Sequence, residues 1–252
     1  MKINYLYLLQ TTMAIFGTPF FIFIDSPWFD KYCAHGQDIC NLIMIINYSW
    51  FLYIAKGKLY WIILLMTICS FFAECLGSLI LVLYQYRLKN IPVYIPLGHA
   101  MIYATVYLIC KQPLVWTNHK IIEPYLTKFA FLTAFLSLLL LNDVAGFILY
   151  ILFLITIRHR QKPIFYLSMF FMTYYVELTG TVLSSWEWYG VLGNHPNYPT
   201  IGFTPSCAAG LYILIDLASN SAYLYAKKIK RYIRPLVMNQ WFQSIHKKQA
   251  FQ

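Results

Sequence analysis

Charged residues are scarce in this sequence. Asp, Glu, Lys and Arg make up only 11% of the 252 residues, whereas hydrophobic residues make up 60%. Acidic residues are scarcer than basic ones, with 9 Asp and Glu against 19 Lys and Arg. No polar stretch is long enough to form a soluble domain, so we expect the basic balance to set membrane topology and not to bind nucleic acid. The composition is typical of an integral membrane protein.

Two further absences narrow the reading. The six cysteines lack the C-x-x-C spacing of metal sites, so the sequence predicts no metal centre. Cys33 and Cys40 share one predicted outer loop, where a disulfide and two free thiols are both open alternatives. No small-x-small cleavage site precedes Asp25, so we expect the first apolar run to remain as an anchor and not to be a signal peptide.

Long apolar stretches occupy most of the chain. About 20 apolar residues cross a bilayer as a helix, and we predict eight crossings, at residues 4–24, 39–55, 59–84, 91–110, 126–141, 144–157, 163–184 and 202–225. The fifth and sixth are short and are separated only by Asn142 and Asp143, so a tight hairpin or a re-entrant pair is an alternative, and six or seven crossings stay open. The predicted fold class is all-α, a polytopic integral membrane helical bundle.

Basic residues are distributed unevenly among the predicted loops. If both termini are cytoplasmic, 16 of the 19 Lys and Arg residues fall on the cytoplasmic side, and Lys31, Arg87 and Lys89 fall outside. The positive-inside rule favours this orientation, and we expect a bacterial inner (plasma) membrane. Residues 1–226 are predicted to form one transmembrane domain, and residues 227–252 a basic, amphipathic cytoplasmic tail that lies along the anionic inner leaflet.

A pattern in the third predicted helix returns in the seventh. Residues 71–78 (FFAECLGS) are similar to residues 174–181 (YYVELTGT), and each copy holds a glutamate with a glycine three residues later. The two helices are four crossings apart, so they run in the same direction. This spacing predicts a parallel internal repeat, with units of about 1–111 and 126–226.

Glu74 and Glu177 are the strongest candidates for functional residues. A carboxyl group in hydrocarbon costs several kcal/mol unless it is paired, neutral or facing a wet cavity, and packing does not explain the duplication of so costly a residue. His99 is predicted at a similar depth, and Asp216 lies deeper. Either of these two could instead be a hydrogen-bond partner between helices.

Small and aromatic residues accompany each glutamate. Gly77 follows the first, and Gly180 and Thr181 follow the second, on polar stripes of helical period that are expected to face the bundle interior. An aromatic pair and a proline-containing outer loop then follow each helix. We expect these residues to contact a substrate: Gly77, Tyr84, Tyr86, Gly180, Thr181, Trp186 and Trp188.

Three consecutive motifs carry a family resemblance. Glu74-x-x-Gly77, then Tyr84-x-Tyr86, then residues 91–97 (IPVYIPL) resemble the carotenoid-biosynthesis membrane family that includes bisanhydrobacterioruberin hydratases. The resemblance covers about residues 71–103, whereas the second half looks more like uncharacterised bacterial polytopic membrane proteins. It implies the addition of water to an isoprenoid C=C bond, with no metal or redox cofactor.

The candidate residues suit this chemistry. A carboxyl kept neutral by burial can protonate an alkene, and a second carboxylate can stabilise the carbocation or activate water. We assign Glu74 and Glu177 to these catalytic roles in either order, with His99 and Asp216 as accessory proton carriers. Hydration and cyclisation of a lipid or isoprenoid substrate are both open. The alternatives are a proton-coupled small-molecule transporter and a non-catalytic membrane assembly partner.

Overall fold

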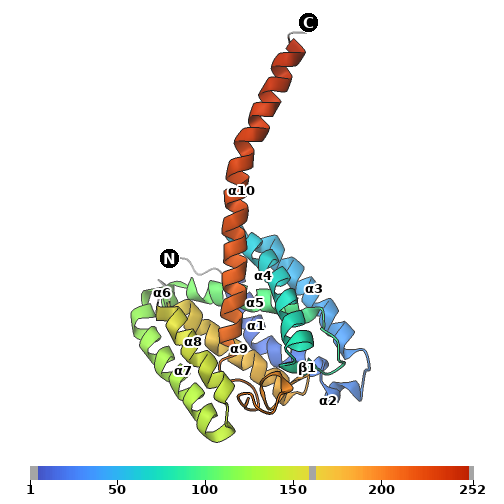
Figure 1. Cartoon of the computed structure of the whole chain (residues 1–252). Helices are drawn as coiled ribbons and strands as arrows, with labels where there is room; N and C mark the ends of the chain where they lie inside the picture. The colour runs from blue at the N-terminus through green and yellow to red at the C-terminus, as the bar shows by residue number, and fades with distance from the viewer. Residues whose placement is uncertain (1–4, 159–162, 250–252) are drawn as a thin grey trace.

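The computed structural model describes residues 5–158 and 163–249, and most of this chain is helical (Figure 1). The long helices are α1 (Tyr5–Ile24), α3 (Gly36–Ile54), α4 (Lys58–Glu74), α5 (Tyr94–Cys110), α7 (His119–Leu141), α8 (Val144–Arg158), α9 (Pro163–Val182) and α10 (Ala209–Gln249). The short elements are α2 (Pro27–Asp30), α6 (Pro113–Thr117), the π-helix η1 (Cys75–Ile80), the 3-10 helix η2 (Leu192–Asn194), and the strands β1 (Tyr84–Tyr86) and β2 (Trp186–Trp188).

The helical class predicted from the sequence is confirmed, and each predicted apolar segment contains one long helix. Several boundaries differ from the prediction, among them the start of α7 at His119 instead of residue 126. The third segment leaves α-helical geometry after Glu74 and continues as η1 before β1 begins. The last helix begins at Ala209 and not at residue 202, because Pro205 lacks the backbone N–H that a helix interior needs.

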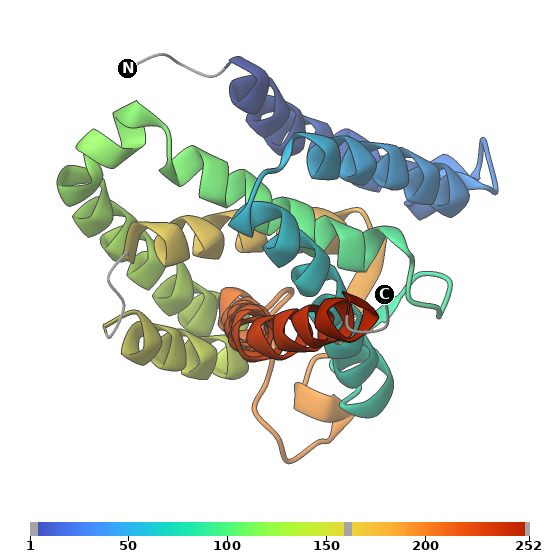
Figure 2. The same ribbon diagram turned by 90° about the horizontal axis from the view of Figure 1, so that it is seen from above.

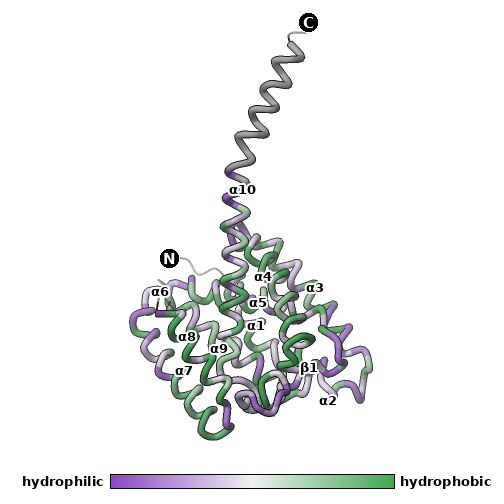
Figure 3. The backbone as a smooth tube through the Cα atoms, viewed as in Figure 1, coloured by the Kyte–Doolittle hydropathy of each residue, from purple (hydrophilic) through white to green (hydrophobic). Residues whose placement is uncertain are grey.

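Two helices of the described chain are long and apolar enough to cross a membrane, Lys58–Ile80 and His119–Leu141. Three apolar helices are shorter: Leu8–Ile24, Tyr94–Cys110 and Val144–Arg158. Large apolar side chains lie exposed on the outside of the bundle, for example Phe20 and Leu140. Figure 3 shows hydrophobic residues along the bundle helices and hydrophilic ones near α2 and α6.

Helix α5 lies inside the bundle and contacts α1, α3, α4 and α9. Seen from above, α1 and α3 lie on one side and the pair α7 and α8 on the other (Figure 2). The turn between α7 and α8 is a tight hairpin, in which Asn142 is left-handed with φ of 54°. Asp143 then accepts hydrogen bonds from the backbone N–H groups of Gly146 and Ser206, at 3.1 and 2.7 Å, which fixes the loop before α10.

Strands β1 and β2 form an antiparallel ribbon that joins the two halves of the chain, with Tyr84 opposite Trp188 and Tyr86 opposite Trp186. Successive side chains of a strand point to opposite faces. The four aromatic residues are therefore buried on one face, whereas Gln85 and Glu187 pair on the other. Three residues are too few for a clear period of two, and the sequence analysis placed both segments in loops.

A buried ion pair holds one end of this ribbon. Asp25, which is fully buried after α1, accepts hydrogen bonds from Arg87 Nη2 at 3.0 Å and from Tyr94 Oη at 2.6 Å. Arg87 follows β1 and Tyr94 begins α5, so the carboxylate joins three elements.

The sequence left open whether Cys33 and Cys40 form a disulfide or are two free thiols. In the structure both are free thiols.

Helix α10 leaves the bundle and passes the predicted domain boundary at residue 226 without a break (Figure 1). The amphipathic character predicted for the tail rests on side chains after residue 231, which lie outside the described residues. Part of the predicted loop at 158–162 lies outside them as well.

Candidate active site

Glu74 and Glu177 are both buried, with exposed fractions of 3% and 8%, and each binds the aromatic pair of its own half. Tyr84 Oη donates to Glu74 Oε2 at 2.7 Å, and Tyr86 Oη donates to the same oxygen. Burial, together with the nearby Glu74 carboxyl, raises the pKa of Tyr86 well above its ordinary value, so this phenol stays a donor at neutral pH.

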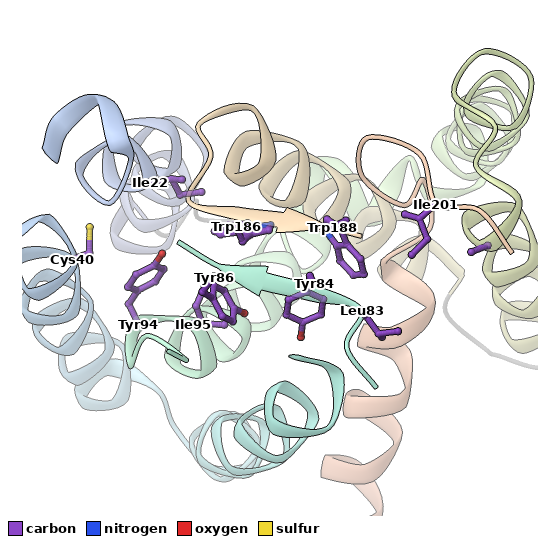
Figure 4. Packing of buried hydrophobic residues seen from close by; sticks show 11 residues of the cluster. Ile22, Cys40, Leu83, Tyr84, Tyr86, Tyr94, Ile95, Trp186, Trp188 and Ile201 are labelled. Atoms are coloured by element: carbon purple, nitrogen blue, oxygen red, sulfur yellow. The ribbon is translucent and has the colours of Figure 1, made fainter. Parts of the chain in front are cut away.

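The second half repeats the arrangement with indoles. Trp186 Nε1 and Trp188 Nε1 donate to Glu177 Oε2 at 3.0 and 3.2 Å. Figure 4 shows the side chains that make these contacts, with Tyr84 and Tyr86 on β1 and Trp186 and Trp188 on β2. Each half therefore presents one carboxyl to two aromatic donors from one strand.

The glycine three residues after each glutamate makes room for this contact. A Cβ atom on Gly77 would lie 2.8 Å from Tyr84 Oη, and one on Gly180 would lie 1.9 Å from the Trp186 ring. The sequence analysis expected both glycines to contact a substrate. In the structure they lie against the aromatic side chain that binds the neighbouring glutamate.

His99 and Tyr212 connect the two carboxyl groups. His99 Nε2, on α5, lies 3.2 Å from Glu74 Oε1 and 3.0 Å from Tyr212 Oη. Tyr212 Oη, on α10, lies 3.4 Å from Glu177 Oε1. All four residues are buried. The result is a continuous chain of polar atoms from Glu74 through His99 and Tyr212 to Glu177.

These residues line a cavity of about 720 Å³. Its wall is largely apolar, and among the described residues none that lines it is Lys or Arg. Several lining side chains are themselves exposed on the outer surface: Met13, Phe16, Phe20, Leu76 and Leu81. The cavity therefore reaches the surface beside α1 and η1 through an apolar mouth.

A second, polar recess lies against the ribbon. Tyr86, Trp186 and Trp188 line both the cavity and this recess, whose wall also includes Gln85, Arg87, Lys89 and Glu187. The aromatic ribbon is thus a thin partition between an apolar space and a polar one.

Three predicted site residues do not line the cavity: Asp216, Gly180 and Thr181. Asp216 is not among the residues that line the cavity, and it accepts hydrogen bonds from Tyr166 Oη at 3.1 Å and Asn220 Nδ2 at 2.7 Å. Asp216 therefore links α10 to α9, one turn beyond Tyr212. Thr181 donates to the backbone carbonyl of Glu177 at 2.9 Å and lines the polar recess, and neither it nor Gly180 lines the cavity.

Tyr212 is the residue that the sequence analysis missed. The available signal was its position four residues before Asp216, which places both on one face of the last helix. With 22 tyrosines in the chain, that signal did not distinguish it from packing residues.

Comparison with protein-family models, with curated proteins and with solved structures gave no match. The likeness of residues 71–103 to the carotenoid-biosynthesis family thus stays a prediction. Within the described residues, no group of three or more His, Cys, Asp and Glu side chains is arranged to hold a metal ion.

Proposed function

We propose that the protein is a membrane-embedded enzyme that uses carboxylic-acid proton chemistry on a C=C bond of an apolar isoprenoid or similar lipid. The observation that carries the proposal is the meeting of Glu74 and Glu177 at the wall of one apolar cavity, linked by His99 and Tyr212. Two buried carboxyls, with no Lys or Arg among the described residues that line the cavity, favour a state in which one proton is retained.

The proposed reaction follows from that proton. The O–H proton of one carboxyl moves to an alkene carbon, the π electron pair forms the new C–H bond, and the other carbon becomes a carbocation. The aromatic rings of the ribbon line the same cavity as the two carboxyls, and an aromatic ring can stabilise a positive charge close to its face. In hydration, a water oxygen bonds to the cation and releases a proton to a carboxylate. In cyclisation, a second C=C bond attacks the cation, and loss of a C–H proton restores the acid.

The shape of the cavity supports an apolar substrate. Its mouth is formed by exposed apolar side chains such as Phe16 and Leu76, so a lipid can enter sideways without crossing a polar surface. Tyr86 and Trp186 separate this space from the polar recess, which offers a nearby source for the single water that hydration consumes.

We further propose that eight helices cross a bacterial inner membrane with both termini in the cytoplasm, and that the two halves form a parallel repeat. Support comes from the positions of charges along the helices. In the proposed topology, Lys56, Lys111 and Arg158 lie at or near the cytoplasmic ends of α3, α5 and α8. Asp25 and Asp143 follow α1 and α7, at the opposite side of the membrane. The repeat is supported by the two matching units of glutamate, glycine and aromatic strand.

A proton-coupled transporter is the second candidate, because the same path between carboxyls can carry coupling protons. One experiment separates the two. Purified protein in nanodiscs is incubated with a polyprenoid extract in the absence of any gradient, and the products are analysed by chromatography and mass spectrometry. Hydration adds the mass of one water, and cyclisation changes retention without changing mass.

Variants Glu74→Gln and Glu177→Gln are expected to lose product while their level in the membrane stays nearly unchanged, since glutamine keeps the shape and removes the acid. Glu187→Gln is the matched control, because Glu187 lies exposed on the opposite face of the same ribbon. The transporter is the better explanation if the extract stays unaltered and sealed vesicles take up a solute only when a proton gradient is imposed.

A further inference from the structure

His99 Nε2 lies within hydrogen-bond distance of two partners, Glu74 Oε1 at 3.2 Å and Tyr212 Oη at 3.0 Å. A ring nitrogen carries either one proton or one lone pair. His99 Nε2 can therefore make a full hydrogen bond to only one of these two oxygens at a time. The other nitrogen, His99 Nδ1, is buried without a hydrogen-bond partner within the described residues. A second contact of Nδ1 usually fixes the tautomer of a functional histidine, and here the ring lacks that restraint.

Tyr212 faces the same choice from the other side. Its hydroxyl carries one proton and lies 3.0 Å from His99 Nε2 and 3.4 Å from Glu177 Oε1. It can therefore donate to only one of these two acceptors at a time. The direction of this single O–H bond depends on where the protons of the neighbours lie.

The outer oxygens of the two carboxyls are occupied by fixed donors. Tyr84 and Tyr86 donate to Glu74 Oε2, and the indoles of Trp186 and Trp188 donate to Glu177 Oε2. An indole N–H is a donor only, so a proton on Glu177 is placed on Oε1, which faces Tyr212. The exchangeable position of Glu177 thus faces the path through Tyr212, and Glu74 Oε1 lies 3.2 Å from His99 Nε2 at the other end of that path.

We propose that Tyr212 is a proton-relay residue that, together with His99, passes one proton between Glu74 and Glu177. In the first arrangement, the proton lies between Glu74 Oε1 and His99 Nε2, and Tyr212 donates to the Glu177 carboxylate. In the second, Glu177 Oε1 holds the proton and donates to Tyr212 Oη, Tyr212 donates to His99 Nε2, and Glu74 is a carboxylate held by two phenols. The proton count is the same in both arrangements.

This inference rests on the proposed function and deepens it. A hydration cycle removes a proton from one carboxyl and returns the proton of water to a carboxylate on the cavity wall. If the acid and the acceptor are different residues, the enzyme must move that proton back before the next turnover. Tyr212 and His99 supply a path for this step that does not open the cavity to solvent.

The test compares Tyr212→Phe with Tyr175→Phe. The first removes one hydroxyl from the path and keeps the ring, and the second removes a tyrosine hydroxyl that donates at 2.7 Å to the backbone carbonyl of Ile15, outside the cavity lining. In the polyprenoid assay we expect Tyr212→Phe to lower kcat by about 100-fold, as loss of a positioned proton carrier does, with little change in KM. Tyr175→Phe is expected to leave both unchanged.

A second readout needs no turnover. Infrared spectra of protein labelled with 13C-glutamate report the carbonyl band of protonated glutamic acid. In the otherwise native protein, we expect Glu74→Gln and Glu177→Gln each to remove part of this band. In a Tyr212→Phe background the Glu177 carboxylate loses the O–H donor that favours its charged form, so the proton is expected to stay on Glu177, and Glu74→Gln should remove none of the band.

The outcomes separate the two proposals. If Glu74→Gln loses activity while Tyr212→Phe turns over normally and keeps the native band composition, the relay is wrong and the proposed function stands. If the native protein leaves the extract unaltered, the proposed function is wrong. The infrared comparison then shows by itself whether Tyr212 relays a proton between the two glutamates. An unchanged band composition in Tyr212→Phe overturns the relay in either case.

Discussion

Tyr86 and Trp186 lie opposite each other across the β1–β2 ribbon, and each donates a hydrogen bond to the glutamate of its own half, Glu74 or Glu177. The backbone pairing of the two strands therefore fixes the relative position of the two carboxyls. A short ribbon at the end of a helical bundle sets the geometry of the site more directly than the packing of the helices that carry the glutamates.

The glycines beside the carboxyls give a first prediction. Gly180→Ala places a methyl group against the Trp186 ring, so we expect the free energy of unfolding to fall by about 1–3 kcal/mol. Gly77→Ala is expected to cost less, because its obstacle is the terminal hydroxyl of Tyr84. Thermal unfolding in detergent measures both. Gly190→Ala is the control, since a Cβ there meets nothing within 4 Å. Equal midpoints for Gly180→Ala and Gly190→Ala would contradict the packing.

The ion pair at the end of the ribbon gives a second prediction. Asp25→Ala removes the 3.0 Å partner of the largely buried Arg87 guanidinium and leaves it only the half-exposed Asp30, at 3.4 Å, so we expect the free energy of unfolding to fall by up to about 3–5 kcal/mol. Asp38→Ala breaks an exposed contact with His35 and should change stability little. Unfolding of both variants in parallel checks this contrast. A similar loss for the two would show that burial does not determine the strength of the Asp25 pair.

The sequence was sufficient to predict the helical segments and part of the site. Apolar runs of the right length indicated the helices, and the recurrence of glutamate, glycine and an aromatic pair indicated residues that the structure brings together. Glu74, Tyr84, Tyr86, Glu177, Trp186 and Trp188 all line one cavity, as does His99. These signals are local, since each lies within about a dozen consecutive residues.

The rest depends on contacts between distant segments. Tyr212 reaches His99 because α10 packs against α4 and α9, which both contact α5, and no local pattern in a tyrosine-rich sequence indicates that contact. Asp25 and Arg87 were predicted as loop charges, and their pairing follows from how the end of α1 meets the ribbon. Asp216 was assigned to the site although it lies one helical turn away from Tyr212, where its partners are Tyr166 and Asn220.

Membrane orientation gives a third prediction, which rests on the split of 16 basic residues to 3 between the two sides. Reporter fusions after Lys162 and after Arg234 should both report cytoplasm, whereas a fusion within residues 190–198 should report the opposite side. An alkaline phosphatase and a fluorescent-protein reporter at each position provide mutual controls. An external signal from the fusion after Arg234 would overturn the proposed eight crossings.

The position of Asp216 gives the last prediction. Asp216→Asn removes the acid and keeps the size of a side chain that binds Tyr166 and Asn220 away from the cavity. We expect this variant to keep most of the native turnover, and to unfold at a somewhat lower temperature because hydrogen bonds to a charged group are stronger than those to a neutral one. Turnover and thermal unfolding are measured on the same preparation, beside Glu177→Gln. If Asp216→Asn loses turnover as completely as Glu177→Gln while its unfolding temperature is unchanged, Asp216 takes part in the proton chemistry, and the path through Tyr212 extends one turn further along α10.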